Sequence, residues 1–289
     1  MESFLFLATG DWGGSSGIFE INKKNVKKQK NIDFYILLGD NFYPSGVSSV
    51  EDHQWDNKYK ATFSTLIPSF AILGNHDYVL SPDSQILYSQ KESSWKMPFY
   101  YYDMILNLPH SSAHFIFLDT CILGDDITIN LLRNTDTRPQ NIERYVKIMK
   151  KYEEKQKRWL EEILENSTSK WKIVCGHYPV YSMGPHMISR KFQQYISPLL
   201  EKYQVDFYIS GHDHNLQHIF NKGVNYVVAG AFSSFYPKVK QAFPSLLYEC
   251  RFFSKSSGFA KFEIKDDFIL LEFIGSDGQS IYKHFCKKN

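Results

Sequence analysis

Residues 34–43 read FYILLGDNFY, a run of five hydrophobic residues that leads directly into a glycine and two polar residues. An unbroken hydrophobic run of this length is typical of a strand that is buried on both faces of a sheet. The glycine lets the chain turn sharply, so that Asp40 and Tyr43 follow just after the strand. Ligands of open α/β sheets bind beyond the carboxyl ends of the strands. The stretch therefore predicts both a buried strand and a candidate functional position.

The same pattern recurs along the chain. Further hydrophobic runs that end in polar clusters lie at Phe4–Thr9, Phe70–Leu73, Phe115–Leu118, Trp171–Cys175 and Asp206–Ile209. Helix-like stretches separate the runs, at residues 16–30, 51–66, 142–166 and 189–203. Strands that alternate with helices predict open sheets with helices on the outside.

The C-terminal third is richer in strands. It contains Val224–Ala229 and then three predicted antiparallel strands at Gly258–Ile264, Phe268–Ile274 and Ser280–Phe285, with turns at Asp266–Asp267 and Asp277–Gly278. We therefore expect an α/β (α+β) fold, a four-layer β-sandwich of two mixed sheets flanked by helices. We also expect residues 1–289 to form a single catalytic domain, in which the polar segment 122–141 is an exposed loop.

Composition narrows the class of protein. Aromatic residues make up 16% of the 289 residues, which predicts a tightly packed core, and the net charge of +2 argues against a nucleic-acid or membrane-surface partner. The sequence contains no run of 18 apolar residues, so no membrane span is expected. None of the four cysteines forms a CxxC pair, so a cysteine zinc site is not expected. Cys121 and Cys175 suit free buried thiols, although disulfides stay possible in an oxidising compartment.

The polar clusters at the strand ends carry oxygen and nitrogen donors that suit transition metals. The donors are Asp11, Asp40, Tyr43, Asn75, His76, His177, His212 and His214. Each cluster alone is explained by an ordinary turn. Together they are hard to explain by packing, because buried polar groups are costly without partners and a shared metal site would supply those partners.

The order of these clusters resembles the calcineurin-like metallophosphoesterase superfamily. Most branches of that superfamily begin with D-x-H, whereas here Gly13 stands two residues after Asp11. Tyr43, three residues after Asp40, is similar to the tyrosine of the purple acid phosphatases. The segments Gly176–Ser182 and Gly211–Gln217 resemble the small, tartrate-resistant type in particular.

The resemblance implies a role for each donor. Asp40 bridges two metal ions. Asp11, Tyr43 and His214 complete the first site, and Asn75, His177 and His212 complete the second. The anionic donors of the first site favour Fe(III), and the neutral donors of the second suit a divalent ion, Fe(II), Zn(II) or Mn(II).

The implied activity is hydrolysis of phosphate monoesters by a metal-bound hydroxide, with an acidic working pH. His76 and His186 are the candidates that protonate the leaving group, His186 because its offset of nine residues from His177 matches a histidine of the resembled family. Asp77 and Asp213 are expected to orient ligand histidines.

Other functions stay open. The same site would serve a phosphodiesterase or nucleotide-cleaving enzyme, and redox chemistry at iron would be a side activity. A non-catalytic scaffold is a further alternative, because some parasite relatives that anchor to membranes keep the fold. Those relatives lose metal ligands and carry a membrane tail, and neither is expected here.

The resemblance also sets expectations about partners and location. We expect small phosphorylated substrates or phosphoproteins, a monomer, and secretion or an acidic, lysosome-like vesicle. Small acid phosphatases carry an exposed, cleavable loop that restrains activity, and segment 122–141 occupies its place.

Overall fold

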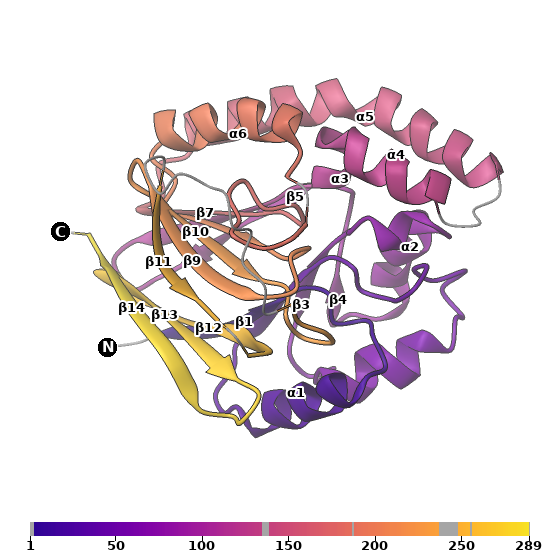
Figure 1. Ribbon diagram of the computed structural model, residues 1–289. Helices are drawn as coiled ribbons and strands as arrows, with labels where there is room; N and C mark the ends of the chain where they lie inside the picture. Colours follow the sequence, from indigo (N-terminus) through magenta and orange to yellow (C-terminus); the bar gives the residue numbers. More distant parts are fainter. Residues whose placement is uncertain (1–2, 135–138, 187, 237–247, 255, 289) are drawn as a thin grey trace.

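Two sheets packed face to face form the centre of the molecule, with helices on both outer sides (Figure 1). The computed structural model describes residues 3–134, 139–186, 188–236, 248–254 and 256–288. Within this part of the chain each sheet has seven strands, and both sheets mix parallel and antiparallel neighbours. The expected four-layer sandwich is confirmed.

The first sheet has the strand order β14-β13-β12-β1-β2-β3-β4. Its strands are β1 (Phe4–Thr9), β2 (Phe34–Leu38), β3 (Ser69–Ile72), β4 (Trp95–Lys96), β12 (Gly258–Ile264), β13 (Phe268–Gly275) and β14 (Ser280–Lys287). The four N-terminal strands are parallel, and β12 joins the edge of β1 in antiparallel fashion. The last three strands form the predicted antiparallel set.

The second sheet has the order β11-β9-β10-β8-β7-β6-β5. Its strands are β5 (Tyr102–Asn107), β6 (Ser112–Phe117), β7 (Trp171–Cys175), β8 (Phe207–Ser210), β9 (Leu216–Asn221), β10 (Val224–Ala229) and β11 (Glu249–Phe253). Strands β6, β7, β8 and β10 run parallel to one another. The carboxyl ends of β6, β7 and β8 therefore lie at one edge of this sheet.

Helices cover the two outer faces. Helix α1 (Gly17–Lys28) lies beside the first sheet, and α5 (Pro139–Asn166) and α6 (Arg190–Lys202) lie over the second (Figure 1). Shorter helices are η1 (Trp55–Lys60), η2 (His76–Tyr78), α2 (Pro82–Lys91), α3 (Thr120–Leu123) and α4 (Asp125–Asn134). Among the described residues, no helix is both long enough and apolar enough to cross a membrane.

Aromatic rings fill the space between the sheets. Phe115 of β6 packs edge-on against Phe6 of β1 and Phe34 of β2, with ring centroids 5.5 and 5.6 Å apart. Phe70 of β3 stacks on Phe117 of β6. The high aromatic content thus builds the interface between the sheets, as the composition predicts.

The prediction that segment 122–141 is an exposed loop is wrong. Its described part contains α4 and the ends of α3 and α5, and Ile122 and Leu132 are fully buried. Asp119 caps α3 by accepting hydrogen bonds from the backbone N–H groups of Cys121 and Ile122. Helical packing against α5 overrides the polar composition. Residues 135–138 of the segment lie outside the described residues, and a regulatory role of the segment stays a prediction.

Candidate metal centre

The loops after the parallel strands of both sheets meet at one place and are tied together by backbone hydrogen bonds. The N–H of Asp11, after β1, donates to the carbonyl of Gly39, after β2, at 3.0 Å. The N–H of Gly211, after β8, donates to the carbonyl of His177, after β7, at 3.1 Å. These bonds fix the backbone of four loops before any side chain is considered.

Three of the expected metal ligands have strained backbones. Asp11, Asp40 and His212 have φ values of 58°, 51° and 65°, in the left-handed region that residues with a Cβ seldom occupy. Such strain persists only where surrounding structure enforces it, and it is concentrated at functional sites. The three side chains are thereby turned toward a common centre.

A first group of donors surrounds the phenol oxygen of Tyr43. This oxygen lies 2.8 Å from Asp11 Oδ1, 2.8 Å from Asp40 Oδ2 and 3.2 Å from His214 Nε2. Metal–ligand bonds of about 2.1 Å at right angles put neighbouring donors about 3 Å apart. The four donors therefore have the spacing of a coordination shell.

A second group lies beside it. His177 Nε2 is 3.0 Å from Asn75 Oδ1 and 3.5 Å from Asp40 Oδ1. Asp40 thus turns one oxygen to Tyr43 and the other to His177. One oxygen of Asp11, one of Asp40 and a nitrogen of His177 lie within 4.8 Å of one another.

His212 lies beside His177 of the second group. Its ring centroid is 5.1 Å from that of His177, and its backbone N–H donates to Asp11 Oδ2 at 2.7 Å. Burial, together with the neighbouring His177 and His186, lowers the pKa of His212 well below its usual value of 6.5. The ring is therefore neutral, as a metal ligand must be.

Hydrogen bonds set the orientation of the other rings. His177 Nδ1 lies 2.8 Å from the carbonyl of Leu38, which only accepts. Nδ1 therefore carries the proton, and the lone pair of Nε2 points at Asn75 and Asp40. His214 Nδ1 contacts the hydroxyl of Ser234 at 2.5 Å and turns its Nε2 toward Tyr43 in the same way.

The charges of the first group call for a cation. Asp11 and Asp40 are buried. Burial of the Tyr43 phenol is the main cause that raises the pKa of Tyr43 well above 10.0, and the two carboxylates beside it raise this pKa further. Buried carboxylates are costly unless a positive charge balances them. Burial also opposes ionisation of Asp11, yet His214 beside it keeps the pKa of this carboxyl below the usual range. The residues present thus fit metal ions of high charge.

Position 13 has no room for a side chain. A Cβ on Gly13 would lie 2.5 Å from the carbonyl oxygen of Asn41 and the backbone of Phe42. A histidine ligand at this position would require the loop after β2 to move. Tyr43 provides a donor from the neighbouring loop instead.

The two candidate acid–base histidines lie at the rim. His76 contacts the Pro44 carbonyl through Nδ1 at 2.7 Å, and its Nε2 is 3.9 Å from Asp40 Oδ2. His186 contacts the carbonyl of His212 through Nδ1 at 2.7 Å. The side chains are 25% and 32% exposed, so each reaches both the centre and the solvent.

Asp77 and Asp213 support loops. Asp77 is fully buried and accepts hydrogen bonds from the N–H groups of Gly74 and Asn41 and from Gln85 Nε2. Asp213 accepts from the hydroxyl of Ser182 and, at 3.2 Å, from the N–H of His186. These contacts hold the loops of Asn75 and His186, whereas the expectation was that the carboxylates orient ligand rings.

Two contributors have no signal in the sequence. Ser234 contacts His214, and Tyr236 stacks on the His214 ring with centroids 5.1 Å apart. Both follow β10, whose end carries no motif of the kind found after β1, β2, β3, β7 and β8. Only the parallel pairing of β10 with β8 brings this segment to the centre.

Comparisons with known proteins identify a family and several similar proteins. The family model described as calcineurin-like phosphoesterase matches residues 4–216. The tartrate-resistant acid phosphatase type 5 of Oryctolagus cuniculus is 30% identical over 298 residues, which cover 96% of this chain and 89% of the relative.

Two solved structures are also similar. The structure described as GAP50, the anchor in the inner membrane complex of Plasmodium, has a TM-score of 0.81 and 27% identity, and the match covers 99% of this chain and 89% of that one. A purple acid phosphatase from yellow lupin (Lupinus luteus) seeds has a TM-score of 0.68 at 16% identity, covering 99% of this chain and 54% of that one. At that identity the second likeness shows the fold alone.

Proposed function

The chain belongs to the calcineurin-like phosphoesterase family, and from this premise we propose that it is an acid phosphatase that hydrolyses phosphate monoesters at a pair of metal ions. The observation that carries the proposal is the position of Asp40. Its two carboxylate oxygens face two different groups of donors, 2.8 Å from the Tyr43 oxygen on one side and 3.5 Å from His177 Nε2 on the other. A carboxylate so placed suits a bridge between two ions.

In this proposal the first ion is held by Asp11, Asp40, Tyr43 and His214, and the second by Asp40, Asn75, His177 and His212. Two carboxylates and a phenolate supply hard, anionic donors, which favour Fe(III) in the first position. An amide and two imidazoles are neutral, which suits Fe(II), Zn(II) or Mn(II) in the second. When bound, the ions would draw the phosphate oxygens to them and lower the pKa of a water molecule, so that hydroxide is present below neutral pH.

The protein's own residues prepare the rest of the reaction. The Leu38 carbonyl and the Ser234 hydroxyl hold the rings of His177 and His214 in place, so that no reorganisation is needed when substrate binds. His76 and His186 stand at the rim of the centre. We assign to them the binding of the phosphate and the delivery of a proton to the leaving alcohol.

A visible spectrum with metal analysis tests the metal assignment. An Fe(III)–tyrosinate pair gives an absorption band in the visible, so Tyr43→Phe should abolish the band and lower phosphatase activity at pH 5 by at least about 100-fold. Tyr203→Phe is the matched control, since Tyr203 follows α6 and its carbonyl contacts Lys172 at the amino end of β7. A colourless, fully active protein with zinc in both positions would refute the iron assignment and leave the hydrolase proposal intact.

The choice of substrate tests the reaction. We expect p-nitrophenyl phosphate to be hydrolysed faster at pH 5 than at pH 7, and faster than bis(p-nitrophenyl) phosphate at both. A preference for the bis-ester would identify a phosphodiesterase with the same centre.

The two rim histidines can be tested through the leaving group. An alkyl phosphate needs a proton on its departing oxygen, whereas p-nitrophenolate departs without one. His76→Asn or His186→Asn should therefore lower kcat for the alkyl ester by about 100-fold or more, and for the aryl ester by much less. His110→Asn, on the exposed β5–β6 turn, is the control. Equal losses for both esters would mean that the histidine binds phosphate without delivering the proton.

A scaffold without catalysis is the second candidate, and the similarity to GAP50 favours it. That protein is described as an anchor, and its structure is close to this one over nearly the whole chain. Against this candidate, the sequence keeps all seven expected donors, and donor distances of 2.8–3.5 Å connect six of them. A protein that binds no metal and hydrolyses neither ester at any pH would be a scaffold.

A further inference from the structure

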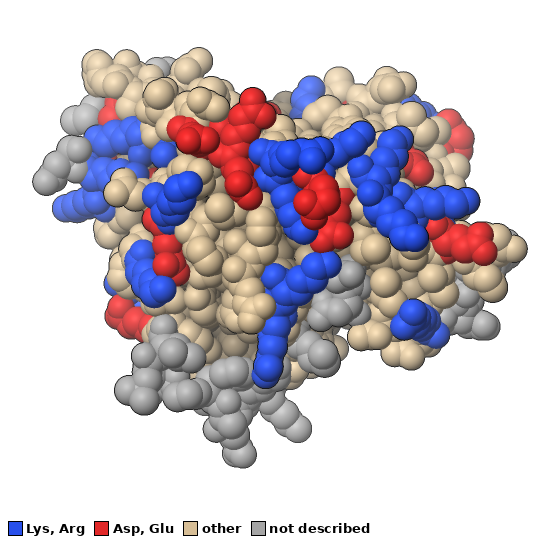
Figure 2. Space-filling model, turned by 90° about the horizontal axis from the view of Figure 1, so that it is seen from above, with Lys and Arg blue, Asp and Glu red and all other residues tan. Residues whose placement is uncertain are grey.

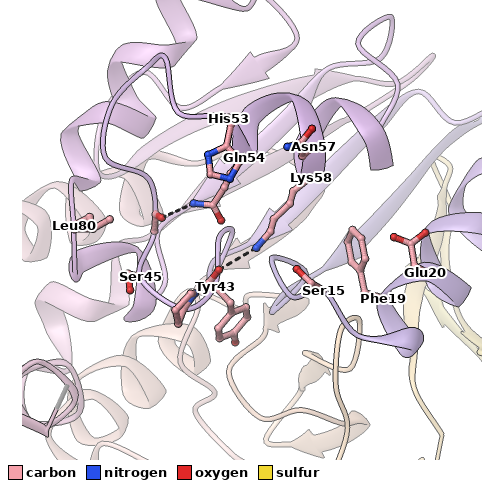
Figure 3. A pocket seen from close by; sticks show the side chains of 12 residues that line it. Ser15, Phe19, Glu20, Tyr43, Ser45, His53, Gln54, Asn57, Lys58 and Leu80 are labelled. Carbon is pink, nitrogen blue, oxygen red and sulfur yellow. Dashed lines mark hydrogen bonds between the residues drawn. The ribbon is translucent and has the colours of Figure 1, made fainter. Parts of the chain in front are cut away.

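A cavity of about 580 Å³ lies next to the candidate metal centre and shares residues with it (Figure 3). Tyr43 and Pro44 form one part of its wall, and Ser15, four residues after Asp11, forms another. His76 packs against the same segment. Its ring centroid lies 4.5 Å from that of Tyr43, and its Nδ1 contacts the Pro44 carbonyl oxygen. The cavity therefore begins at Tyr43, a donor of the candidate metal centre, and at the segment that His76 contacts.

The opposite wall is built by an uncommon element. Helix η1 has π-helical hydrogen bonding, which is rare and is found mostly at functional sites. Its Trp55 and Tyr59 are buried in the aromatic core, while Asn57 and Lys58 line the cavity. The wider turn thus serves two surfaces at once, the core on one side and the cavity on the other.

Lys58 joins this wall to the metal-binding loops. Its ammonium group donates to the carbonyl of Gly13 and, at 3.0 Å, to the carbonyl of Tyr43 (Figure 3). Gly13 is two residues from Asp11, so the lysine links two of the three loops that supply the first group of donors. The charge of Lys58 is thereby committed to two backbone oxygens, and burial lowers the pKa of its side chain.

The remaining lining combines apolar and polar side chains. Phe19 and Leu80 are apolar, and the imidazole of His53 lies 3.4 Å from the Asp52 carboxylate. Glu20, in the first turn of α1, pairs with Lys23 at 3.4 Å and complements the positive end of the helix. Ser15, Ser45, Gln54 and Asn57 add hydroxyl and amide groups, which both donate and accept hydrogen bonds. A second phosphate group needs uncommitted cations. Of the basic lining residues, Lys58 is bonded to two carbonyls and His53 lies beside Asp52, so this surface suits a second phosphate poorly. It suits hydroxyl groups, which also donate and accept.

We propose that this cavity receives the alcohol part of the substrate and selects a neutral alcohol with several hydroxyl groups, such as a sugar or a polyol. The proposal rests on the proposed function, because it assumes that phosphate binds at the metal centre. The cavity volume falls within the range of small-molecule sites and exceeds what a single sugar ring requires. Asn57 is the residue whose side chain contributes selectivity without touching the metal-binding loops.

Calorimetric binding of phosphonate analogues to the metal-loaded protein tests this without turnover. We expect a phosphonate analogue of glucose 6-phosphate to bind about tenfold more tightly than methylphosphonate. Asn57→Leu keeps the size of the side chain and removes its amide. It should weaken binding of the sugar phosphonate by about threefold to tenfold and leave the affinity for methylphosphonate unchanged. Asp56→Leu is the matched control, because Asp56 lies on the same turn, is 73% exposed and pairs with Lys60 outside the cavity.

A second variant and a second ligand complete the test. Ser15→Trp fills the cavity from an exposed position and should also remove the preference for the sugar. Equal binding of the two phosphonates by the unaltered protein would overturn the proposal, as would tighter binding of methylenediphosphonate. Hydrolysis of phosphate esters is measured separately. Selective binding without hydrolysis would contradict the proposed function alone, and hydrolysis without selective binding would contradict the cavity assignment alone.

Discussion

Gly74 lies where the loop after β3 crosses the Asp40 carboxylate. A Cβ at this position would be 2.2 Å from both the backbone nitrogen and Oδ1 of Asp40, closer than any two such atoms can approach. The N–H of Gly74 also donates to Asp77 at 2.8 Å. A glycine here is thus required by the approach of two backbones, and the position of the bridging carboxylate depends on it.

Gly74→Ala should displace Asp40 and weaken metal binding. We expect a loss of unfolding free energy of about 1–3 kcal/mol and a larger proportional loss of bound metal, because overpacking forces the backbone to shift. Urea denaturation and metal analysis of the purified variant measure the two effects. Gly17→Ala is the control, since a Cβ there meets no atom within 4 Å and should change stability by less than about 0.5 kcal/mol. Full metal content in Gly74→Ala would show that the loop can shift to accommodate the added Cβ without displacing Asp40.

The junction of β6 and α3 is the clearest case at the scale of an element. Asp119 lies two residues after the strand, caps the helix and accepts a hydrogen bond from the hydroxyl of Tyr78. Burial raises the pKa of Asp119 to about 7. The folded protein therefore keeps a proton on this carboxyl across a pH range in which the unfolded chain, with a pKa of about 3.9, has released it.

The stability of the junction should depend on pH in a defined direction. Between about pH 4 and pH 7 the folded state binds more protons than the unfolded state at Asp119, so stability falls as pH rises, by about 1.4 kcal/mol per unit. Below this range both states are protonated, and above it both are ionised, so the slope vanishes. Asp119→Asn should flatten the dependence, as measured by denaturation of the chelator-treated protein at pH 4, 5.5 and 7. An unchanged slope would mean that another group sets it.

Surface charge shows a second property of the elements. On the face seen from above the helices, basic and acidic side chains alternate and no large patch of one sign forms (Figure 2). Lys157 of α5, for example, pairs with Glu153 and Glu154 at 2.9 and 2.6 Å. On this face the mixture of charges agrees with the net charge of +2.

At the scale of the whole molecule, the two sheets share the candidate centre. Asp11, Asp40 and Asn75 follow strands of the first sheet, whereas His177, His212 and His214 follow strands of the second. Bound ions would therefore link the two halves of the sandwich, and they would add positive charge beside the buried carboxylates of Asp11 and Asp40.

Metal removal should lower the unfolding temperature. A ligand that binds only the folded state stabilises it by about 4 kcal/mol at a thousandfold excess over its dissociation constant. Calorimetric scans of chelator-treated and metal-reconstituted protein measure the difference, which should be smaller in Tyr43→Phe. Identical unfolding temperatures with and without metal would argue against a centre that bridges the sheets.

The sequence by itself determined the strands that build the site and the residues at their ends. β1, β2, β7 and β10 begin and end at the predicted residues, because largely buried strands need predominantly apolar sequence. The donors were identifiable because several such clusters follow strands in one chain, although each cluster alone could be an ordinary turn. The significance of Gly13 and Tyr43 came from the resemblance to the purple acid phosphatases.

Tertiary structure decided what depends on long-range packing. The helices of segment 122–141 are stabilised by contact with α5, which no local period reveals. Ser234 and Tyr236 reach the centre only because β10 pairs with β8, and the cavity exists only because η1 faces the loops of Asp11 and Tyr43. Local sequence encodes strands and turns through the chain's own sterics and burial pattern, whereas these features arise from segments that are far apart along the chain and meet only on folding.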